Sequence, residues 1–206
     1  MSILETVAAG VVLVGAAICA VGLIRLILAT HHLPFRTDVA PAKGSAARGV
    51  LYAFTTGMAP WAKESARIHW LAYIRGILFH LGIFLGFALL AASPWLTEIP
   101  APIRLPTGAV LAVGTLMGVA GFWIRLREPA LRRVSTPDDY ASLGLTTLFL
   151  ALGGLSAAVV EFLPAFWVIS GILLAYTPFS KLRHFVYFFY ARTFFGLTFG
   201  HRGLLE

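Results

Sequence analysis

Five long apolar stretches constrain this chain more than any other feature of its sequence. They run from about residue 7 to 29, 69 to 93, 105 to 126, 141 to 163, and from 165 onward. A helix needs about 20 mostly apolar residues to cross the hydrocarbon core of a bilayer. The stretches therefore predict an all-α integral membrane bundle of five transmembrane helices, with residues 1–206 forming a single domain.

Composition supports lipid as the solvent for much of the chain. Hydrophobic residues make up 59% and charged residues 12%, whereas soluble domains carry about 25% charged residues. The first six residues contain no basic side chain and the apolar run that follows exceeds 20 residues, so we expect a retained span and not a cleaved signal peptide. The single Cys19 excludes a disulfide within the chain, and the absence of a Cys-x-x-Cys-His motif argues against c-type haem.

Basic residues gather on one side of the predicted membrane. They lie between the first and second stretches, between the third and fourth, and in the tail: Arg36, Lys43, Arg48, Lys63, Arg67, Arg125, Arg127, Arg132, Arg133, Arg192 and Arg202. The other side holds Glu5, Glu98, Arg104 and Glu161. Because cytoplasmic loops are rich in Lys and Arg, the amino terminus is expected outside and the carboxyl terminus in the cytoplasm. The net charge of +7 is thus a topology signal, and no nucleic-acid partner is expected.

The fifth stretch is too long for one thickness of hydrocarbon. It continues through FWVISGILLAYTPFSKLRHFVYFFYAR, which ends at Arg192. We expect it to tilt, to bend at Pro178, or to project from the membrane.

Histidines carry the predicted chemistry. His69 and His80 share the second stretch eleven residues apart, so on a helix they face the same way about 16 Å apart. This spacing fits two haem groups stacked across a membrane, because neutral imidazole is a good axial ligand for haem iron. The alternative is that each histidine is a hydrogen-bonded structural group or a proton relay.

Two further ligands are needed, and His184 and His201 are the candidates. An antiparallel helix reverses the order of depth, so His80 should pair with His184 and His69 with His201. His184 and His201 are seventeen residues apart, which on a straight helix separates them by about 25 Å along the axis and by a rotation of roughly 100°. A straight helix would therefore not bring both imidazoles to the two histidines of the second stretch. We therefore expect the chain to break near Gly196 and Gly200.

Other polar and small residues have two interpretations each. His31 and His32 follow the first stretch and are expected at the membrane interface. Arg67, Arg75 and Arg183 either extend to the membrane surface or pair with haem propionates. Some glycines either allow close helix packing or leave room for a flat macrocycle, namely Gly82, Gly86, Gly114, Gly118 and Gly121. Glu98, Arg104 and Glu161 could contact a quinone but are expected as solvated loop residues.

A family resemblance rests on three features of the sequence. The stretch TPFSKLRHFVYFFYAR, which contains His184, resembles the gamma subunit of respiratory nitrate reductase, and so does the His69–His80 arrangement. The segment LRRVSTPDDYASL resembles the related membrane subunits of heterodisulfide-reductase-type and sulfite-reduction-associated complexes. The resemblance extends from the first stretch to the tail.

The resemblance implies a five-helix dihaem cytochrome b with its amino terminus outside, in a bacterial or archaeal cytoplasmic (inner) membrane. His80 and His184 would hold a distal b-type haem near the outer face, and His69 and His201 a proximal one near the cytoplasm. The subunit would move electrons between the quinone pool and an iron–sulfur redox subunit on the cytoplasmic face, within a hetero-oligomeric complex. No catalytic residue is assigned to this chain. A haem-free anchor and a small histidine-relay proton channel or transporter are the alternatives.

Overall fold

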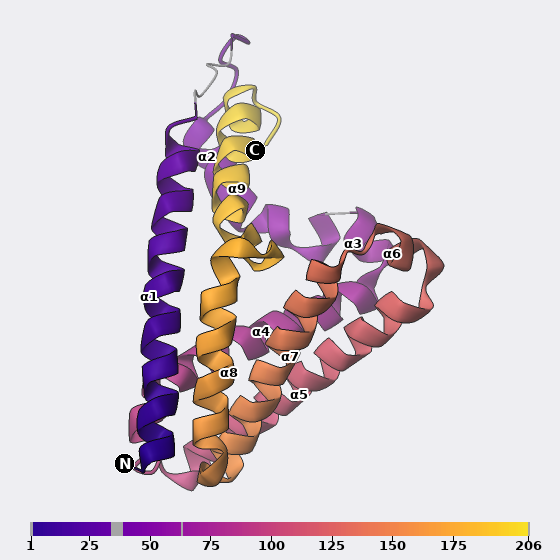
Figure 1. The fold of residues 1–206 in the computed structure, drawn as a ribbon. Helices are drawn as coiled ribbons and strands as arrows, with labels where there is room; N and C mark the ends of the chain where they lie inside the picture. Colours follow the sequence, from indigo (N-terminus) through magenta and orange to yellow (C-terminus); the bar gives the residue numbers. More distant parts are fainter. Residues whose placement is uncertain (1, 34–38, 63, 206) are drawn as a thin grey trace. The chain divides into compact units, whose positions relative to one another are not determined.

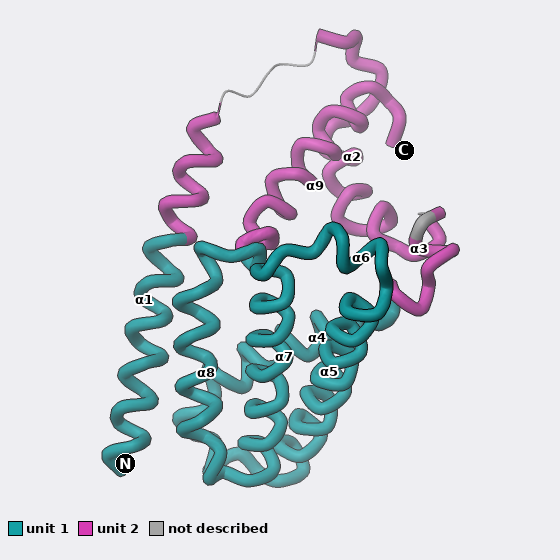
Figure 2. The backbone as a smooth tube through the Cα atoms, turned by 45° about the vertical axis from the view of Figure 1, so that its right-hand side comes forward, with its two compact units in different colours: residues 1–22, 74–182 teal, residues 23–73, 183–206 magenta. Residues whose placement is uncertain are grey.

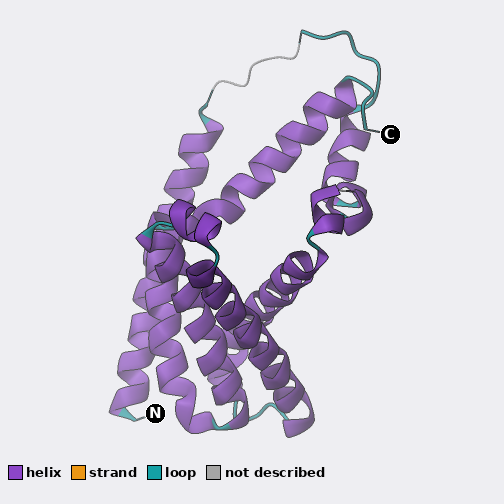
Figure 3. Cartoon of the chain, turned by 90° about the vertical axis from the view of Figure 1, so that its right-hand side faces the viewer, coloured by secondary structure: helices purple, strands orange, loops and turns teal. Residues whose placement is uncertain are grey.

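The computed structural model describes residues 2–33, 39–62 and 64–205, which are mostly helical and contain no strand (Figures 1 and 3). The α-helices are α1 (Ile3–His31), α2 (Ala46–Phe54), α3 (Glu64–Ile68), α4 (Trp70–Ala92), α5 (Ala101–Arg127), α6 (Pro129–Val134), α7 (Pro137–Ala158), α8 (Leu163–Tyr176) and α9 (His184–His201). The predicted all-α class is confirmed. Arg36 and Lys63, two of the basic residues used to predict orientation, lie outside the described residues.

Five helical segments in the described part of the chain are long and apolar enough to cross a membrane. They are Ile3–His31, Trp70–Trp95, Ala101–Arg127, Pro137–Ala158 and Val160–Phe179. Two of these segments extend their α-helix by 3₁₀ turns: Ser93–Trp95 follows α4, and Val160–Phe162 and Thr177–Phe179 lie on either side of α8. The prediction of five apolar spans is confirmed.

The chain divides into two compact units (Figure 2). Unit 1 comprises residues 1–22 and 74–182, which contain most of α1, nearly all of α4, and α5 to α8. Unit 2 comprises residues 23–73 and 183–206, which contain the end of α1, α2, α3 and α9.

Close helix packing in unit 1 depends on glycine. A Cβ atom added at Gly82 of α4 would lie 3.2 Å from the Cα of Gly114 on α5. One added at Gly108 of α5 would lie 3.1 Å from the carbonyl oxygen of Gly154 on α7. Lipid provides no hydrophobic force between helices, so van der Waals contact at small residues stabilises such a bundle.

Aromatic side chains fill the core of unit 1. Phe149 of α7 and Phe166 of α8 are fully buried, with ring centroids 5.3 Å apart. The ring of Phe87 on α4 lies 5.0 Å from that of Phe149. Leu111 and Leu150 are also fully buried and complete the contact among α4, α5, α7 and α8.

One buried hydrogen bond joins the end of α4 to α8. Trp167 donates its indole N–H to the hydroxyl of Ser93 at 2.7 Å, and that hydroxyl donates to the carbonyl of Leu90 at 2.7 Å. Both side chains are buried. The indole, which has one donor and no acceptor, is therefore satisfied within the bundle.

We expect Ser93→Ala to lower the free energy of unfolding by about 1–3 kcal/mol, because it leaves the Trp167 N–H buried without a partner. The measurement is the thermal denaturation midpoint of the purified protein in detergent. Adding Trp167→Phe to Ser93→Ala should recover part of the loss, since it removes the unpaired donor. Strictly additive losses from the two substitutions would contradict this interpretation.

Unit 2 is built on the contact between α2 and α9. The carbonyl oxygen of Gly196 occupies the space where a side chain at Gly49 would stand, and the Cα of Gly200 would lie 2.5 Å from such a Cβ. A Cβ at Gly196 would in turn lie 2.6 Å from the backbone nitrogen of Val50. The two helices thus touch backbone to backbone, which only glycine permits at this distance.

Candidate functional site

His80 lies on α4 within unit 1, and one of its two ring nitrogens is held by the helix backbone. Its Nδ1–H donates to the carbonyl oxygen of Gly76, one turn earlier, at 2.8 Å. The side chain is exposed, and its ring stands edge-on to that of Phe79. A backbone carbonyl that holds one ring nitrogen fixes the tautomer and leaves the other nitrogen as the ligand. Nε2 of His80 is therefore the available ligand atom.

The helix surface beside His80 is open. A Cβ atom added at Gly76 would meet no atom within 4 Å. Gly76 and His80 are four residues apart and share one face of α4. The absence of a side chain at Gly76 leaves the helix surface next to the imidazole open.

Four of the five glycines that the sequence assigned either to helix packing or to a macrocycle serve packing. Gly82 and Gly114 contact each other, Gly86 faces the Phe149 ring at 2.6 Å, and Gly118 faces the Phe79 ring at 2.7 Å, all measured from an added Cβ. At Gly121 the nearest atom would be 3.8 Å away, the Nε of Arg75. Close helix packing is therefore the role of the first four, and Gly121 has ordinary clearance.

His69 belongs to unit 2 and stands immediately before α4. Its backbone carbonyl accepts the N–H of Tyr73 at 3.0 Å, so it occupies the N-cap position of that helix. Its side chain is exposed. The sequence predicted that the second span begins at His69, whereas α4 begins one residue later, at Trp70.

His184 is the first residue of α9 and not a residue of the fifth span. The fifth apolar segment ends at Phe179, and α-helical structure stops at Tyr176 and resumes only at His184. Between them lie the 3₁₀ turns Thr177–Phe179 and Lys181–Arg183, separated by Ser180, whose backbone is extended. The overlong stretch therefore breaks at Pro178, one of the predicted outcomes.

His201 is the last residue of α9 and anchors a neighbouring segment of unit 2. Its Nε2–H donates to the carbonyl oxygen of Ala40 at 3.0 Å. Its own carbonyl oxygen accepts the N–H groups of Lys43 and Gly44, at 2.9 and 3.1 Å. Through these bonds His201 holds residues 40–44 against the end of α9. Ligation of iron by Nε2 would require the ring to break its hydrogen bond to the carbonyl oxygen of Ala40.

The predicted break at Gly196 and Gly200 is wrong. α9 runs without interruption from His184 to His201, and both glycines are buried against α2. The two histidines therefore remain seventeen residues apart on one helix, about 25 Å along its axis and roughly 100° around it. His80 lies in unit 1 and the other three candidates in unit 2, and both ligand pairs stay predictions.

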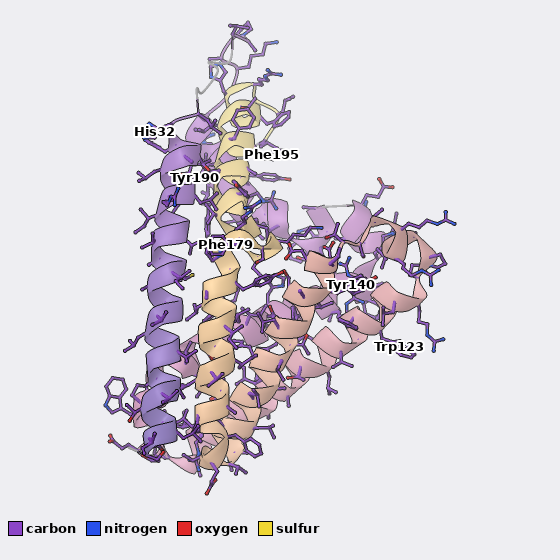
Figure 4. All side chains as sticks on the ribbon, in the orientation of Figure 1. His32, Trp123, Tyr140, Phe179, Tyr190 and Phe195 are labelled. Atoms are coloured by element: carbon purple, nitrogen blue, oxygen red, sulfur yellow. The ribbon has the colours of Figure 1, made fainter. Side chains whose placement is uncertain are left out.

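His31 and His32 end α1. His31 is its last residue, both side chains are exposed, and their rings stand edge-on with centroids 6.3 Å apart. In unit 2 the hydroxyl of Tyr190 on α9 lies 3.4 Å from the carbonyl of Ile27, near this end of α1 (Figure 4).

The sequence did not predict a polar cluster that joins the start of α7 to residue 181. We call it the Asp138–Lys181 cluster, and its members are Thr136, Asp138, Asp139, Ser142, Tyr176 and Lys181, all in unit 1. Asp138 accepts hydrogen bonds from the Tyr176 hydroxyl, from Ser142 and from the backbone N–H of Lys181. Asp139 accepts from the backbone and hydroxyl of Thr136 and from Nζ of Lys181.

Part of this cluster has a recognisable sequence signal. Thr136 and Asp139 form a capping box, with Pro137 in the first turn of the helix, and the pattern Thr-Pro-Asp-Asp is typical of a helix start. The contact with Lys181 has no such signal, because 42 residues separate it from Asp139.

The acidic and basic residues at the opposite end of unit 1 make fewer contacts. Glu98 and Glu161 are exposed. Arg104 on α5 is partly buried, and among the described residues its Nε has no hydrogen-bond partner.

Comparison with known proteins finds no matching protein family, curated protein or solved structure.

Proposed function

We propose that this chain is a dihaem cytochrome b, the membrane subunit of a respiratory redox complex. It would move electrons between the quinone pool and an iron–sulfur partner on the cytoplasmic face, oxidising quinol or reducing quinone. The observation that carries the proposal is His80: an exposed imidazole in the middle of an apolar helix, with Nδ1 fixed by Gly76 and open space beside it. An ionisable residue within a span is costly and indicates function.

The proposed orientation is supported by the basic residues at the end of α5 in unit 1. Its last turn holds Arg125 and Arg127, and α6 adds Arg132 and Arg133. The guanidinium of Arg127 lies 4.3 Å above the ring of Trp123, an exposed aromatic residue of the kind found at membrane interfaces (Figure 4). These residues support a cytoplasmic location for this end and, with five spans, an amino terminus outside.

Each proposed residue has a defined task. His80 and His184 would bind one haem, and His69 and His201 the other. Two imidazoles on one iron support one-electron transfer and leave no open coordination site. Quinol releases two electrons and two protons on oxidation, whereas a haem accepts one electron at a time. The two haems would therefore pass the electrons of quinol across the bilayer one by one. Arg67, Arg75 and Arg183 stand close in sequence to these histidines and suit pairing with propionate groups.

The direct test is the reduced-minus-oxidised visible spectrum of the purified full-length chain, combined with a haem count by the pyridine method. We expect b-type α bands and about two haems per chain. The matched control is the double variant His31→Ala/His32→Ala, which removes two histidines from the end of α1 and should keep both haems. A folded chain without haem would overturn the proposal and favour the anchor or proton-relay alternatives.

A further inference from the structure

An open apolar groove runs along the contact between α5 and α7 in unit 1, and the proposed function does not use it. It lies between residues 115–123 of α5 and 144–151 of α7 and has a volume of about 340 Å³. The two threonines that line it donate their hydroxyls to their own helices: Thr115 to the carbonyl of Leu111 at 2.9 Å and Thr147 to that of Leu143 at 2.7 Å. The groove therefore presents methyl groups and rings, which suit a hydrocarbon chain.

The length of the groove matches one leaflet of a bilayer. The eight helical residues from Thr115 to Trp123 extend over about 12 Å, and half of a 30 Å hydrocarbon core is about 15 Å. Trp123 is exposed at one end, where the ring of Tyr140 on α7 stands edge-on to that of Phe122 with centroids 5.6 Å apart (Figure 4). Because Trp and Tyr gather at membrane–water interfaces, we place this end at the interface and call it the mouth of the groove.

Arginines surround the mouth. The guanidinium of Arg127 lies 4.3 Å above the Trp123 ring, one turn beyond the groove. α6 begins two residues later and adds Arg132 and Arg133, whose side chains are exposed. Within the part of the chain that the structure describes, none of these three guanidinium groups has a carboxylate oxygen within 4.0 Å.

The carboxylates at this end of unit 1 do not cancel that charge. Asp138 and Asp139 accept hydrogen bonds within the Asp138–Lys181 cluster. Arg125 lies 3.9 Å from Asp139 and is directed toward the same cluster. Glu128 is exposed beside three arginines, which leaves a positive excess at the mouth of the groove.

We propose that this groove binds an acyl chain of an anionic phospholipid, with the phosphate group of the lipid among Arg127, Arg132 and Arg133. The groove alone cannot select a lipid, because all lipid tails are as apolar as its walls. Selection comes from the basic side chains beside the span, which attract anionic headgroups. An arginine that stacks on an aromatic face still presents the N–H groups of its edge, and these pair with phosphate through parallel hydrogen bonds. The proposal does not depend on haem.

A second groove in the same unit provides a control. It lies between α1 and α8 and has a similar volume, about 350 Å³, but none of the described residues that line it is charged. Each groove contains a glycine at which a larger side chain would fill it, Gly144 on α7 and Gly10 on α1. An added Cβ at Gly144 would lie 3.8 Å from the Phe122 ring, and one at Gly10 would meet no atom within 4 Å.

The test is native mass spectrometry of the purified full-length chain after incubation with equal amounts of phosphatidylglycerol and phosphatidylcholine that have identical acyl chains. We expect the wild type to retain phosphatidylglycerol over phosphatidylcholine by more than tenfold. Arg127→Gln should lower this ratio about fivefold, and Arg132→Gln/Arg133→Gln by at least as much. Arg127→Lys keeps the charge and should lower it less. Arg48→Gln, which removes the same charge from an exposed residue of unit 2, should change it less than twofold.

The filling variants test the groove itself. Gly144→Leu should lower the retention of phosphatidylglycerol at least fivefold, whereas Gly10→Leu should leave it unchanged. Unaltered retention in Gly144→Leu would overturn the proposal, because the headgroup would then bind without the groove. So would a wild type without preference, or equal losses in Arg127→Gln and Arg48→Gln, which would reflect net charge alone. Thermal denaturation reports folding, and should Gly144→Leu misfold, the comparison of Arg127→Gln with Arg48→Gln decides.

Discussion

His80→Ala should reduce the haem content from about two per chain to about one, with loss of roughly half of the reduced α-band intensity. His184→Ala should remove the same haem. The reason is that each imidazole supplies one of only two axial bonds to the iron, and Nε2 of His80 is the atom that its bond to Gly76 leaves available. The measurement is a pyridine haem count together with the EPR g values and potential of the haem that remains.

Double variants make this prediction specific. His80→Ala/His184→Ala should lose no more haem than either single variant, since both act on one iron. His80→Ala/His69→Ala should lose both haems. The pairing is wrong if His80→Ala and His184→Ala leave different haems behind, or if their losses add.

The positions of the membrane helices were largely predictable, because twenty-residue apolar runs have few alternatives. The differences lie at the ends. We expected the fourth span to begin near residue 141, but α7 begins at Pro137. Asp138 and Asp139 lie in the first turn of this helix, where carboxylates stabilise it through capping and the helix dipole.

The end of the fifth stretch shows where local patterns become insufficient. Pro178 indicated a bend, and the helix does stop there. The segment that follows is hydrogen-bonded through Lys181 to Asp138 and Asp139, about 40 residues earlier in the chain. No periodicity in the stretch itself carries that information.

The predicted chain break at two glycines was wrong because it, too, depended on a contact distant in sequence. Gly196 and Gly200 suit both a chain break and a close helix contact, and their own neighbours in sequence favour neither. The outcome depends on Gly49, whose missing side chain lets α2 approach. The four-residue spacing of Gly196 and Gly200 was a usable signal, since small residues at this spacing are typical of packed membrane helices.

The candidate site was predictable in part. The bond from His80 to Gly76 follows from helix geometry, because a side chain at one position reaches the carbonyl one turn earlier. The bond from His201 to Ala40 joins residues 161 positions apart and could not be predicted locally. It gives the His201 ring a structural partner that the spacing of the histidines did not suggest.

The contact between α2 and α9 leads to the second large expected effect. We expect Gly49→Ala and Gly196→Ala each to lower the free energy of unfolding by about 1–3 kcal/mol or more. The added methyl group meets backbone atoms, among them the Cα of Gly200 at 2.5 Å and the nitrogen of Val50 at 2.6 Å, and backbone cannot rotate away as a side chain can. Thermal denaturation in detergent measures the loss.

The matched control is Gly10→Ala on α1, the same chemical change at a position where a Cβ meets no atom within 4 Å. It should leave the midpoint unchanged or raise it, since alanine favours a helix over glycine by about 0.5–1 kcal/mol. Gly49→Ala/Gly196→Ala should cost less than the sum of the single variants, because the first methyl group already separates the helices. Equal midpoints for Gly49→Ala and Gly10→Ala would mean that α2 and α9 do not meet through backbone contact.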